Sequence, residues 1–441
     1  MNTLKKNDRI SVKITDWTEK GLAKGTYKSI DIIVPFTVPG DIVLAHITKV
    51  TSTMAYGKLL DFSTRSPNRA SAPCAVFGQC GGCQLQHMSY ETQLDYKKTL
   101  VQAAFQKGGL SHPPLIIDST DAPYAYRNKS QFSISRMDTG RTLIGLSAPR
   151  SQRIIDCKSC DIQHPLTNLA LDIVRRHLRK RALPVSHLVT RVGVNTQELM
   201  VALVSSQKTM PELKELITEL RTIPELKSVY LSHNTNPEWV VLGDSETLLW
   251  GSPTINETVA GLTLSLSLRS FFQANTYQIE PLWTKISDLM ALKKTDVIWD
   301  LYSGTGSLSI YLAQKAKYLI GIESHPEAIK NAKKNALVNS ISNTKFIEGD
   351  VEAILPTLQD PCDGVIVDPP RKGLTPTIIK SLLELDPPKL LYVSCSPESL
   401  VRDLKGLCSN GYQIKAVELV DLFPQTYHVE TLVMLERIER T

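Results

Sequence analysis

From about residue 270 onward, short apolar runs alternate with stretches of helical spacing, and this pattern restricts the fold more than any other feature of the chain. The runs are VIWDLYSG, YLIGIES, NTKFIEGD, DGVIVDPP, KLLYVSCS and YQIKAVELV. Apolar strands separated by helices are typical of a mostly parallel sheet with helices on both faces. We therefore predict an α/β domain over residues 270–441.

The preceding part of the chain divides into two further regions. Residues 1–62 hold short β-rich runs separated by Gly, Pro and Asp, a spacing typical of a small β-barrel. Residues 63–269 begin with a linker-like stretch, SPNRASAP, and then mix strand-like and helical pieces. We expect a multidomain α/β chain with an N-terminal barrel, a central α+β domain and the C-terminal domain.

The composition is that of an ordinary soluble protein, with 42% hydrophobic and 21% charged residues. No apolar run approaches the roughly 18 residues of a membrane-spanning helix, and the N-terminus has no signal-peptide core. A cytoplasmic location is expected, where the eight cysteines stay reduced unless they bind metal or take part in chemistry. Residues 1–72 carry 11 Lys and Arg against 6 Asp and Glu, which indicates a polyanionic partner.

The turn after the first of the C-terminal runs has the form of a ligand-binding loop. In DLYSGTGSLSI, Gly304 and Gly306 join a strand end to a helix start, so that backbone can approach a ligand at the carboxyl edge of the sheet. Ser309 stands where a dinucleotide-binding fingerprint has its third glycine, and the loop therefore favours a ligand without a pyrophosphate.

Acidic residues end the next three apolar runs. Glu323 can accept hydrogen bonds from ribose hydroxyls, Asp350 can face an adenine edge, and Asp368 begins the segment DPPRKG. Each acid taken singly also fits a helix N-cap, but three acids at consecutive strand ends share one edge of the sheet. Together with the glycine turn, they resemble the Rossmann-like fold of S-adenosylmethionine-dependent methyltransferases.

Cys395 lies in YVSCSPESL, between an apolar run and a stretch of helical spacing. The thiol is expected at the same edge of the sheet, and a helix N-terminus beside it favours the thiolate. Methyl transfer to carbon 5 of uracil needs such a group, because a thiolate added to carbon 6 creates an enolate whose carbon 5 can attack a methyl sulfonium. A general base must then remove the carbon 5 proton. DLFPQTYHVETLVML offers Glu430 as that base, and His428 as a surface or helper residue.

Four sequence blocks resemble the RNA uracil-5-methyltransferase family, in the family's order: SFFQANTYQIEPLW, DPPRKG, YVSCSPESLVRDL and DLFPQTYHVET. The resemblance implies S-adenosylmethionine as methyl donor, Cys395 as nucleophile and Glu430 as base. The residues that it implies for the donor are Gln273, Tyr302, Ser307, Glu323, Asp350 and Asp368. Ser303 replaces a cysteine common in the family's DLYCG motif, and Asp350 stands where some members have Asn.

A group of cysteines occurs early in the chain, in CAVFGQCGGCQLQH. Cys74, Cys80 and Cys83 lie so close in sequence that we expect a metal site. The fourth ligand is expected from Cys157 or Cys160, and spacing alone does not separate zinc from an iron–sulfur cluster. The region resembles the ribosomal-RNA branch of the family, which implies a [4Fe–4S] cluster with Cys160 as the fourth ligand. The barrel resembles a TRAM domain, an RNA-binding β-barrel.

The expected partner is RNA with a flipped-out or single-stranded uridine, rather than DNA or a membrane. A barrel plus a cluster resembles the 23S ribosomal RNA enzymes, and a tRNA uracil-5-methyltransferase is the first alternative. An RNA cytosine-5-methyltransferase is the second, although this chain has Pro370 and Arg371 where those enzymes carry a further cysteine. A non-catalytic RNA-binding iron–sulfur protein is the last, and it has no need of both Cys395 and Glu430. YRNKSQF, at residues 126–132, is read either as an RNA contact or as a strand edge.

Overall fold

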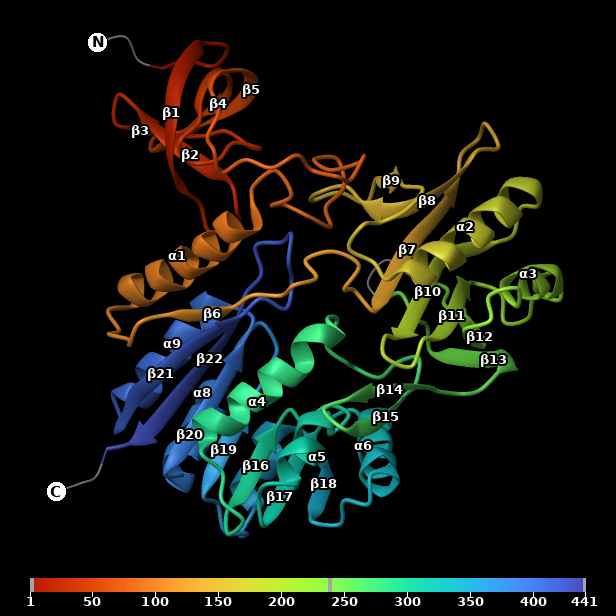
Figure 1. Cartoon of the computed structure of the whole chain (residues 1–441), viewed down its shortest axis with the longest axis vertical. Coiled ribbons are helices and arrows are strands. Elements are labelled where there is room, and N and C mark those ends of the chain that lie inside the picture. The colour runs from red at the N-terminus through yellow and green to blue at the C-terminus, as the bar shows by residue number, and fades with distance from the viewer. Residues whose placement is uncertain (1–3, 237–239, 439–441) are drawn as a thin grey trace.

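The computed structural model describes residues 4–236 and 240–438, and the chain forms three parts that are distinct in Figure 1. The first is a closed barrel of five strands in the order β1-β2-β3-β5-β4. Its strands are β1 (Arg9–Trp17), β2 (Ala23–Tyr27), β3 (Ile30–Ile33), β4 (Ile42–Val50) and β5 (Met54–Thr64). Along β1, Ile10, Val12 and Ile14 are buried at every second position, because successive side chains of a strand face opposite sides. The predicted N-terminal barrel is confirmed.

The central part is a seven-stranded sheet in the order β13-β12-β11-β10-β7-β8-β9. Its elements are β7 (Lys129–Arg136), β8 (Thr142–Ser147), β9 (Ile154–Asp156), α2 (Pro165–Lys180), β10 (Val185–Gly193), β11 (Glu198–Ser205), α3 (Leu213–Leu220), β12 (Leu226–His233) and β13 (Ser245–Gly251). β11 and β12 run parallel, with α3 between them in the chain, whereas β10 pairs antiparallel with both of its neighbours. A hairpin of β14 (Ile255–Val259) and β15 (Leu262–Leu266) leads on to the C-terminal part.

The C-terminal part contains an eight-stranded sheet in the order β18-β17-β16-β19-β20-β22-β21-β6. Its strands are β6 (Ile116–Asp118), β16 (Val297–Leu301), β17 (Tyr318–Glu323), β18 (Thr344–Glu348), β19 (Gly364–Val367), β20 (Lys389–Ser394), β21 (Tyr412–Val420) and β22 (Glu430–Arg437). The strands from β18 to β20 are parallel, and β22 is antiparallel to β20 and β21. The chain order reverses between β16 and β19, where open α/β sheets bind their ligands.

Helices cover both faces of this sheet, as the alternating sequence pattern predicted (Figure 1). They are α4 (Ile279–Met290), α5 (Ser307–Ala313), α6 (Pro326–Val338), α7 (Val351–Ile354), α8 (Pro376–Leu385) and α9 (Pro397–Cys408), with the 3-10 turns η1 (Thr276–Gln278) and η2 (Leu355–Thr357). One hydrophobic core packs under α4, α5 and α6, and a second packs under α8 and α9. Among the helices that the structure describes, none is long and apolar enough to span a bilayer.

Two elements from the first third of the chain complete this C-terminal part. α1 (Tyr90–Gly108) buries Val101 and Phe105 in the same core as α9, and Figure 1 shows the two helices side by side. β6 adds a parallel edge strand to β21 through Glu418, Leu419 and Val420. Both elements precede the central sheet in sequence, so the chain leaves the C-terminal part, builds the central part and then returns.

Candidate active site

Strand pairing brings the two proposed reactive side chains together. β20 and β22 are antiparallel, and the last pair in their register is Ser394 opposite Thr431. Continuing this register by one residue sets Cys395 opposite Glu430. Cys395 precedes Ser396, the N-cap of α9, and Glu430 begins β22 with only 4% of its surface exposed. The predicted position of Cys395, between a buried strand and a helix, is confirmed.

The surroundings of Cys395 hold its proton more firmly than the sequence indicated. Burial raises the pKa of the Cys395 thiol, and the nearby carboxyl groups of Glu430 and Asp368 raise it further. The Arg371 guanidinium lowers this pKa by its charge and by a hydrogen bond to the thiol. Burial and the two carboxyl groups outweigh Arg371, so the thiol pKa lies above its ordinary value, and the expected effect of the helix N-terminus stays a prediction. Arg371 is the neighbour that favours the thiolate.

Three carboxyl groups lie close together behind the thiol. Burial raises the pKa of Asp300 to about 7, although Ser309 donates a hydrogen bond to it, and burial with Asp300 nearby raises the pKa of Asp368 to about 7. Burial and Asp368 also raise the pKa of Glu430. Like charges this close disfavour simultaneous ionisation, so the group retains protons near neutral pH. A raised pKa suits a carboxyl group that takes up a proton during a reaction.

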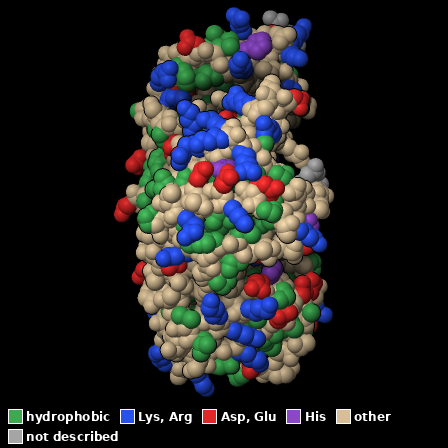
Figure 2. All heavy atoms as spheres, turned by 90° about the vertical axis from the view of Figure 1, so that its right-hand side faces the viewer, with side chains coloured by type: hydrophobic (Ala, Val, Ile, Leu, Met, Phe, Trp, Pro, Cys, Tyr) green, Lys and Arg blue, Asp and Glu red, His purple; other side chains and the backbone are tan. Residues whose placement is uncertain are grey.

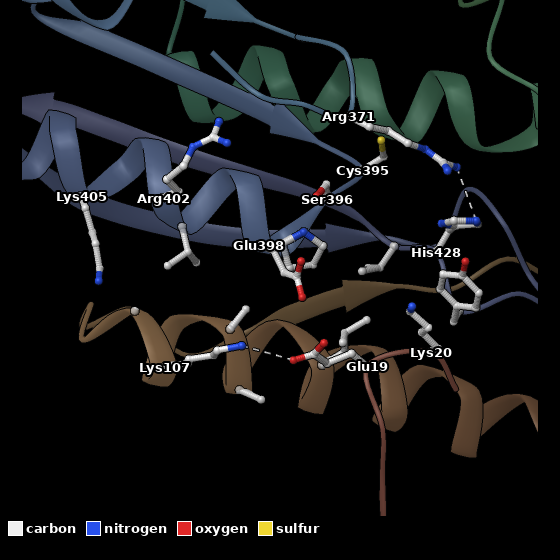
Figure 3. A pocket seen from close by; sticks show the side chains of 18 residues that line it. Glu19, Lys20, Lys107, Arg371, Cys395, Ser396, Glu398, Arg402, Lys405 and His428 are labelled. Carbon is white, nitrogen blue, oxygen red and sulfur yellow. Dashed lines mark hydrogen bonds and ion pairs between the residues drawn. The ribbon is translucent and has the colours of Figure 1, made fainter. Parts of the chain in front are cut away.

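His428 and Arg371 form a pair at the rim of the site. Arg371 Nη2 lies 3.4 Å from His428 Nε2, and the dashed line in Figure 3 marks this contact. Burial, together with the cations of Arg371, Lys97 and Arg127, lowers the pKa of His428 to about 4. The imidazole is then neutral and can accept the hydrogen bond from Arg371. This arrangement suits a helper that orients Arg371 better than a general base.

The glycine turn after β16 lies at the reversal of strand order. Tyr302, Gly304 and Gly306 all have left-handed backbone, with φ values of 67°, 54° and 69°. Glu323, at the end of β17, accepts hydrogen bonds from Gly304 N at 3.1 Å and from His325 N at 2.8 Å. The acid therefore holds the turn as well as facing the ligand edge.

The other residues predicted to contact the methyl donor come from separate segments, of which those with Ser307 and Asp350 follow strands of this sheet. Asp350 caps α7 by accepting a hydrogen bond from Glu352 N at 2.8 Å, so the N-cap alternative is realised at this position. Asp350 also lies near enough to Tyr302 to help raise the pKa of that phenol to about 12, after burial. Ser307 begins α5, and Gln273 accepts a hydrogen bond from Asn128 Nδ2 through its backbone carbonyl oxygen.

These residues fit S-adenosylmethionine by their chemistry. A side chain at Gly304 would find no heavy atom nearer than Phe271 Cδ1 at 3.9 Å, which leaves room beside the turn. The hydroxyl oxygen of Ser303 is buried without a hydrogen-bond partner in the described part of the chain, but it faces Gly321 of β17 and not this space. Acidic groups on the rim suit ribose hydroxyls and an amino group. When bound, the donor supplies a methyl group made electrophilic by its sulfonium.

The two glycines of the turn should differ in their tolerance of alanine. At Gly306, a Cβ atom would lie 2.7 Å from the Phe346 ring and 2.8 Å from Ala332 Cβ, whereas Gly304 has open space. We expect Gly304→Ala to lower the free energy of unfolding by about 1 kcal/mol, for the left-handed backbone alone. Gly306→Ala should lose about 1–3 kcal/mol more through overpacking. Urea unfolding of both variants measures the difference, and equal losses would contradict the predicted contact.

A groove of about 640 Å³ opens from Cys395 between α1 and α9 (Figure 3). Its walls are apolar, with Leu100, Ala104 and Val401 on facing helices. The charged residues that line it are Lys20, Lys107, Arg371, Arg402 and Lys405, against Glu19 and Glu398. Lys107 and Glu19 lie 3.6 Å apart and partly neutralise each other. Arg402 is paired with Asp403 at 2.7 Å, so Lys20, Lys405 and Arg371 are the cations that make the groove suitable for a polyanion that reaches the thiol.

α1 also holds the loop that carries His428 to its place, a contact that sequence reasoning missed. Lys97 Nζ donates a hydrogen bond to Asp421 Oδ1 at 2.6 Å, and both side chains are fully buried. Tyr90 donates to the other oxygen of Asp421 at 3.0 Å, and Gln93 donates to Gln425 at 3.0 Å. The partners are more than 300 residues apart in sequence, so no local pattern could have indicated these pairs. Arg371 was visible in DPPRKG, but its role at the thiol was not.

The early cysteines converge on one small cavity. Cys74, Cys80, Cys83, Cys157 and Cys160 all line a hollow of about 20 Å³. Burial raises the pKa of Cys83 to about 12, with smaller contributions from the neighbouring thiols. Within residues 4–236 and 240–438, no group of three or more His, Cys, Asp or Glu side chains is arranged to hold a metal ion. The donors gather as predicted, but they do not form a closed ligand set.

Known proteins match nearly the whole chain. Residues 89–438 match the family described as tRNA (Uracil-5-)-methyltransferase. An uncharacterized RNA methyltransferase of Clostridium tetani is 37% identical over 447 residues, covering 98% of this chain and 97% of the relative. Another, from Halalkalibacterium halodurans, is 36% identical over 450 residues, covering 98% of this chain and 97% of the relative.

A solved structure shares the overall arrangement. The Pyrococcus abyssi tRNA (uracil-54, C5)-methyltransferase, solved with S-adenosyl-L-homocysteine, superimposes with a TM-score of 0.79 at 26% sequence identity. The match covers 96% of this chain and 99% of the other, so it includes the barrel and the central sheet. The chain therefore belongs to the family of S-adenosylmethionine-dependent RNA uracil-5-methyltransferases.

Proposed function

We propose that this protein methylates carbon 5 of a uridine in 23S ribosomal RNA, with Cys395 as nucleophile and Glu430 as base. The observation that carries the catalytic assignment is the register of β20 and β22, which sets these two side chains opposite each other at the ligand edge. A protein that only bound RNA would gain nothing from a buried carboxyl group held beside a thiol. Membership of a uracil-5 family also favours uridine over cytidine.

Arg371, Cys395 and Glu430 have different roles in the proposed reaction. Arg371 stabilises the Cys395 thiolate against the burial that otherwise keeps the thiol protonated. Since the thiol lines an open groove, its proton can leave to solvent, and the sulfur then adds to carbon 6 of the ring. After carbon 5 is methylated, Glu430 removes the proton that remains there. The released electron pair re-forms the ring double bond and expels Cys395 as thiolate.

The RNA must present its uridine outside a base stack, because carbon 6 is otherwise out of reach of a thiol. The cations of the α1–α9 groove can hold the phosphates on either side of that uridine. Lys and Arg side chains also gather in a band below the barrel (Figure 2). The N-terminal barrel, as a TRAM domain, would extend this contact away from the reacting base.

A tRNA uridine is the second candidate substrate, because the Pyrococcus abyssi tRNA enzyme matches 96% of this chain. Since that match includes the barrel, a barrel alone does not select ribosomal RNA. The test is transfer of a labelled methyl group to transcripts of 23S rRNA and of tRNA, followed by nucleoside mass spectrometry. Labelled 5-methyluridine in 23S rRNA alone supports the proposal, and label in tRNA alone replaces it with the second candidate. Absence of a covalent complex with 5-fluorouridine RNA would overturn the catalytic assignment.

We also propose that Cys74, Cys80, Cys83 and Cys160 hold a [4Fe–4S] cluster with a structural role. The donor types fit, because four thiols line one small hollow with apolar neighbours such as Val76 and Leu146, although the described residues are not arranged as a closed ligand set. A cluster would replace the thiol protons, which burial otherwise retains, and the side chains around the hollow of about 20 Å³ would have to move apart to admit it. The hollow lies between the segment after the barrel and the central sheet, so the cluster would join these two parts.

The cluster proposal predicts different results for two neighbouring cysteines. Cys80→Ser should lose iron, sulfide and the broad visible absorption, and should unfold several degrees below the parent, because metal binding contributes to folding free energy. Cys157→Ala, at the fifth thiol of the hollow, should keep the iron. Iron analysis, spectra and thermal unfolding of both proteins measure this. A Cys80→Ser protein that lacks iron yet keeps the parent's fold and turnover would refute the structural role.

A further inference from the structure

A second hollow lies far from Cys395 in sequence, where the barrel meets the segment that carries the first cysteines. It has a volume of about 710 Å³, within the usual range of ligand pockets. Its walls include Phe36 from the turn after β3, Phe77 and His87 from the following segment, and the guanidinium groups of Arg65 and Arg69. Nothing in the proposed reaction uses these residues.

Phe36, in the aromatic wall, is exposed, and its backbone conformation costs free energy. Phe36 is 41% exposed, although its backbone lies in the left-handed region with φ of 63°. Its ring packs edge-on against Phe77, at 5.7 Å between centroids and 72° between planes. Gly78 leaves room for the ring, because a Cβ atom there would lie 3.1 Å from Phe36 Cζ. Left-handed backbone is uncommon for a residue as large as phenylalanine, and here it holds the ring toward solvent.

Two guanidinium groups lie at the edge of the hollow. Arg65 and Arg69 lie over the Phe62 ring, with their Cζ atoms 4.2 Å and 4.5 Å from its centroid. Arg69 is paired with Asp41 at 2.7 Å and donates to the Phe36 carbonyl oxygen at 3.2 Å, which fixes the turn. Arg65 is exposed and has no ion pair among the described residues. The barrel therefore presents an unneutralised guanidinium beside aromatic faces.

His87 supplies an unsatisfied polar group to the same wall. Its Nε2 lies 3.1 Å from the Thr37 carbonyl oxygen and donates to it, which leaves Nδ1 as an acceptor. Nδ1 is buried and has no partner in the part of the chain that the structure describes. Burial lowers the pKa of His87 to about 4, so the ring stays neutral. A ligand with an N–H group could pair with this nitrogen after a small shift of the wall.

We propose that this hollow binds an unpaired base of the RNA substrate, stacked on Phe36, with its phosphate on Arg65. Aromatic rings beside guanidinium groups form the usual platform for single-stranded nucleic acid, because every base offers a flat face. The excess of basic residues in the N-terminal region suits a polyanion, and the aromatic rings favour RNA because its bases can stack on them. The site would bind the substrate at a nucleotide other than the one that is methylated. The inference rests on the proposed function only in taking RNA as the partner.

The test compares matched variants of the full-length protein. Phe36→Gly removes the ring while its backbone keeps the left-handed conformation, and Phe36→Tyr restores a ring. Leu60→Ala is the control, since Leu60 is 44% exposed on the same barrel but does not line the hollow. The probes are a labelled single-stranded oligouridylate of about 12 nucleotides, a length that one small β-barrel can span, and a duplex of the same length.

We expect Phe36→Gly to bind the single strand about tenfold more weakly, the range for loss of one base–aromatic stack. Phe36→Tyr and Leu60→Ala should bind it like the parent, and no variant should change duplex binding. Phe77→Leu, which removes the supporting ring, should also weaken the single strand. Parent-like binding by both Phe36→Gly and Phe77→Leu would overturn the proposal, as would equal losses for single strand and duplex. These readouts need no methyl transfer, so failure of the catalytic assignment would leave them unaffected.

Discussion

Cys395→Ala is expected to abolish methylation of RNA, lowering turnover by at least about 10⁴-fold, as removal of an enzyme nucleophile does. Without the sulfur, carbon 5 of uracil has no enolate behind it and does not attack a methyl group at a useful rate. The measurement is transfer of a labelled methyl group to substrate RNA under single-turnover conditions. Binding of S-adenosylmethionine, measured by calorimetry, should remain at the level of the parent, because none of the residues proposed to hold the donor changes.

Cys408→Ala serves as the matched control. Cys408 ends α9, the helix that Cys395 precedes, and packs against the hydrophobic core instead of lining the groove. Its loss should leave methylation unchanged. A Cys395→Ala protein that methylates RNA at the parent's rate would remove the basis of the proposed mechanism, whatever the sheet around it looks like.

Glu430→Gln is expected to separate the two halves of the reaction. The amide cannot take the proton from carbon 5, so the methylated ring should stay bonded to Cys395 and turnover should fall by about 10²–10⁴-fold. Because Gln has nearly the same shape as Glu and carries no charge, adduct formation should persist. The variant should therefore accumulate a covalent protein–RNA complex with ordinary uridine, visible as a slower band on a denaturing gel. Mass spectrometry of that complex should show the added methyl group.

Glu436→Gln is the control for this prediction, since Glu436 lies on the same strand and pairs with Lys415 at 3.5 Å, far along β22 from the thiol. It should turn over like the parent and accumulate no adduct. If Glu430→Gln also releases its product at the parent's rate, the base is another group. Asp368, which lies beside Glu430 with a raised pKa, would then be the first candidate.

The proposed mechanism places two opposing demands on the carboxyl groups of Asp300, Asp368 and Glu430. Glu430 must hold a proton well enough to take it from carbon, and burial beside Asp368 supplies this by raising its pKa. The same carboxyl groups raise the pKa of Cys395, which slows formation of the thiolate. Arg371 relieves the second effect, because a cation near the sulfur stabilises its charge. The pair of Arg371 with neutral His428 then keeps the cation oriented toward the site.

Local patterns in the sequence were enough to predict the main layers of the fold. Short β-rich runs separated by Gly, Pro and Asp in residues 1–62 predicted the barrel without any tertiary information, and the burial of Ile10, Val12 and Ile14 on one strand face agrees with it. The apolar runs from β16 to β21 likewise indicated strands buried on both faces of a sheet. In a parallel sheet, the carboxyl ends of such strands lie at the same edge. Cys395 therefore could be placed at the ligand edge from its position in the sequence.

Only the tertiary structure determined the burial, the ion pairs and the pKa values of these residues. The sequence contains Lys97 in a helix and Asp421 in a loop, but only folding buries them against each other and ties α1 and β6 to the C-terminal sheet. The raised pKa of the Cys395 thiol has the same origin, because it depends on burial and on side chains from two other segments, the one with Asp368 and Arg371 and the one with Glu430. Periodicity is a local property, which a chain displays before it folds. Electrostatics and desolvation depend on distances in space, and those exist only once distant segments have packed together.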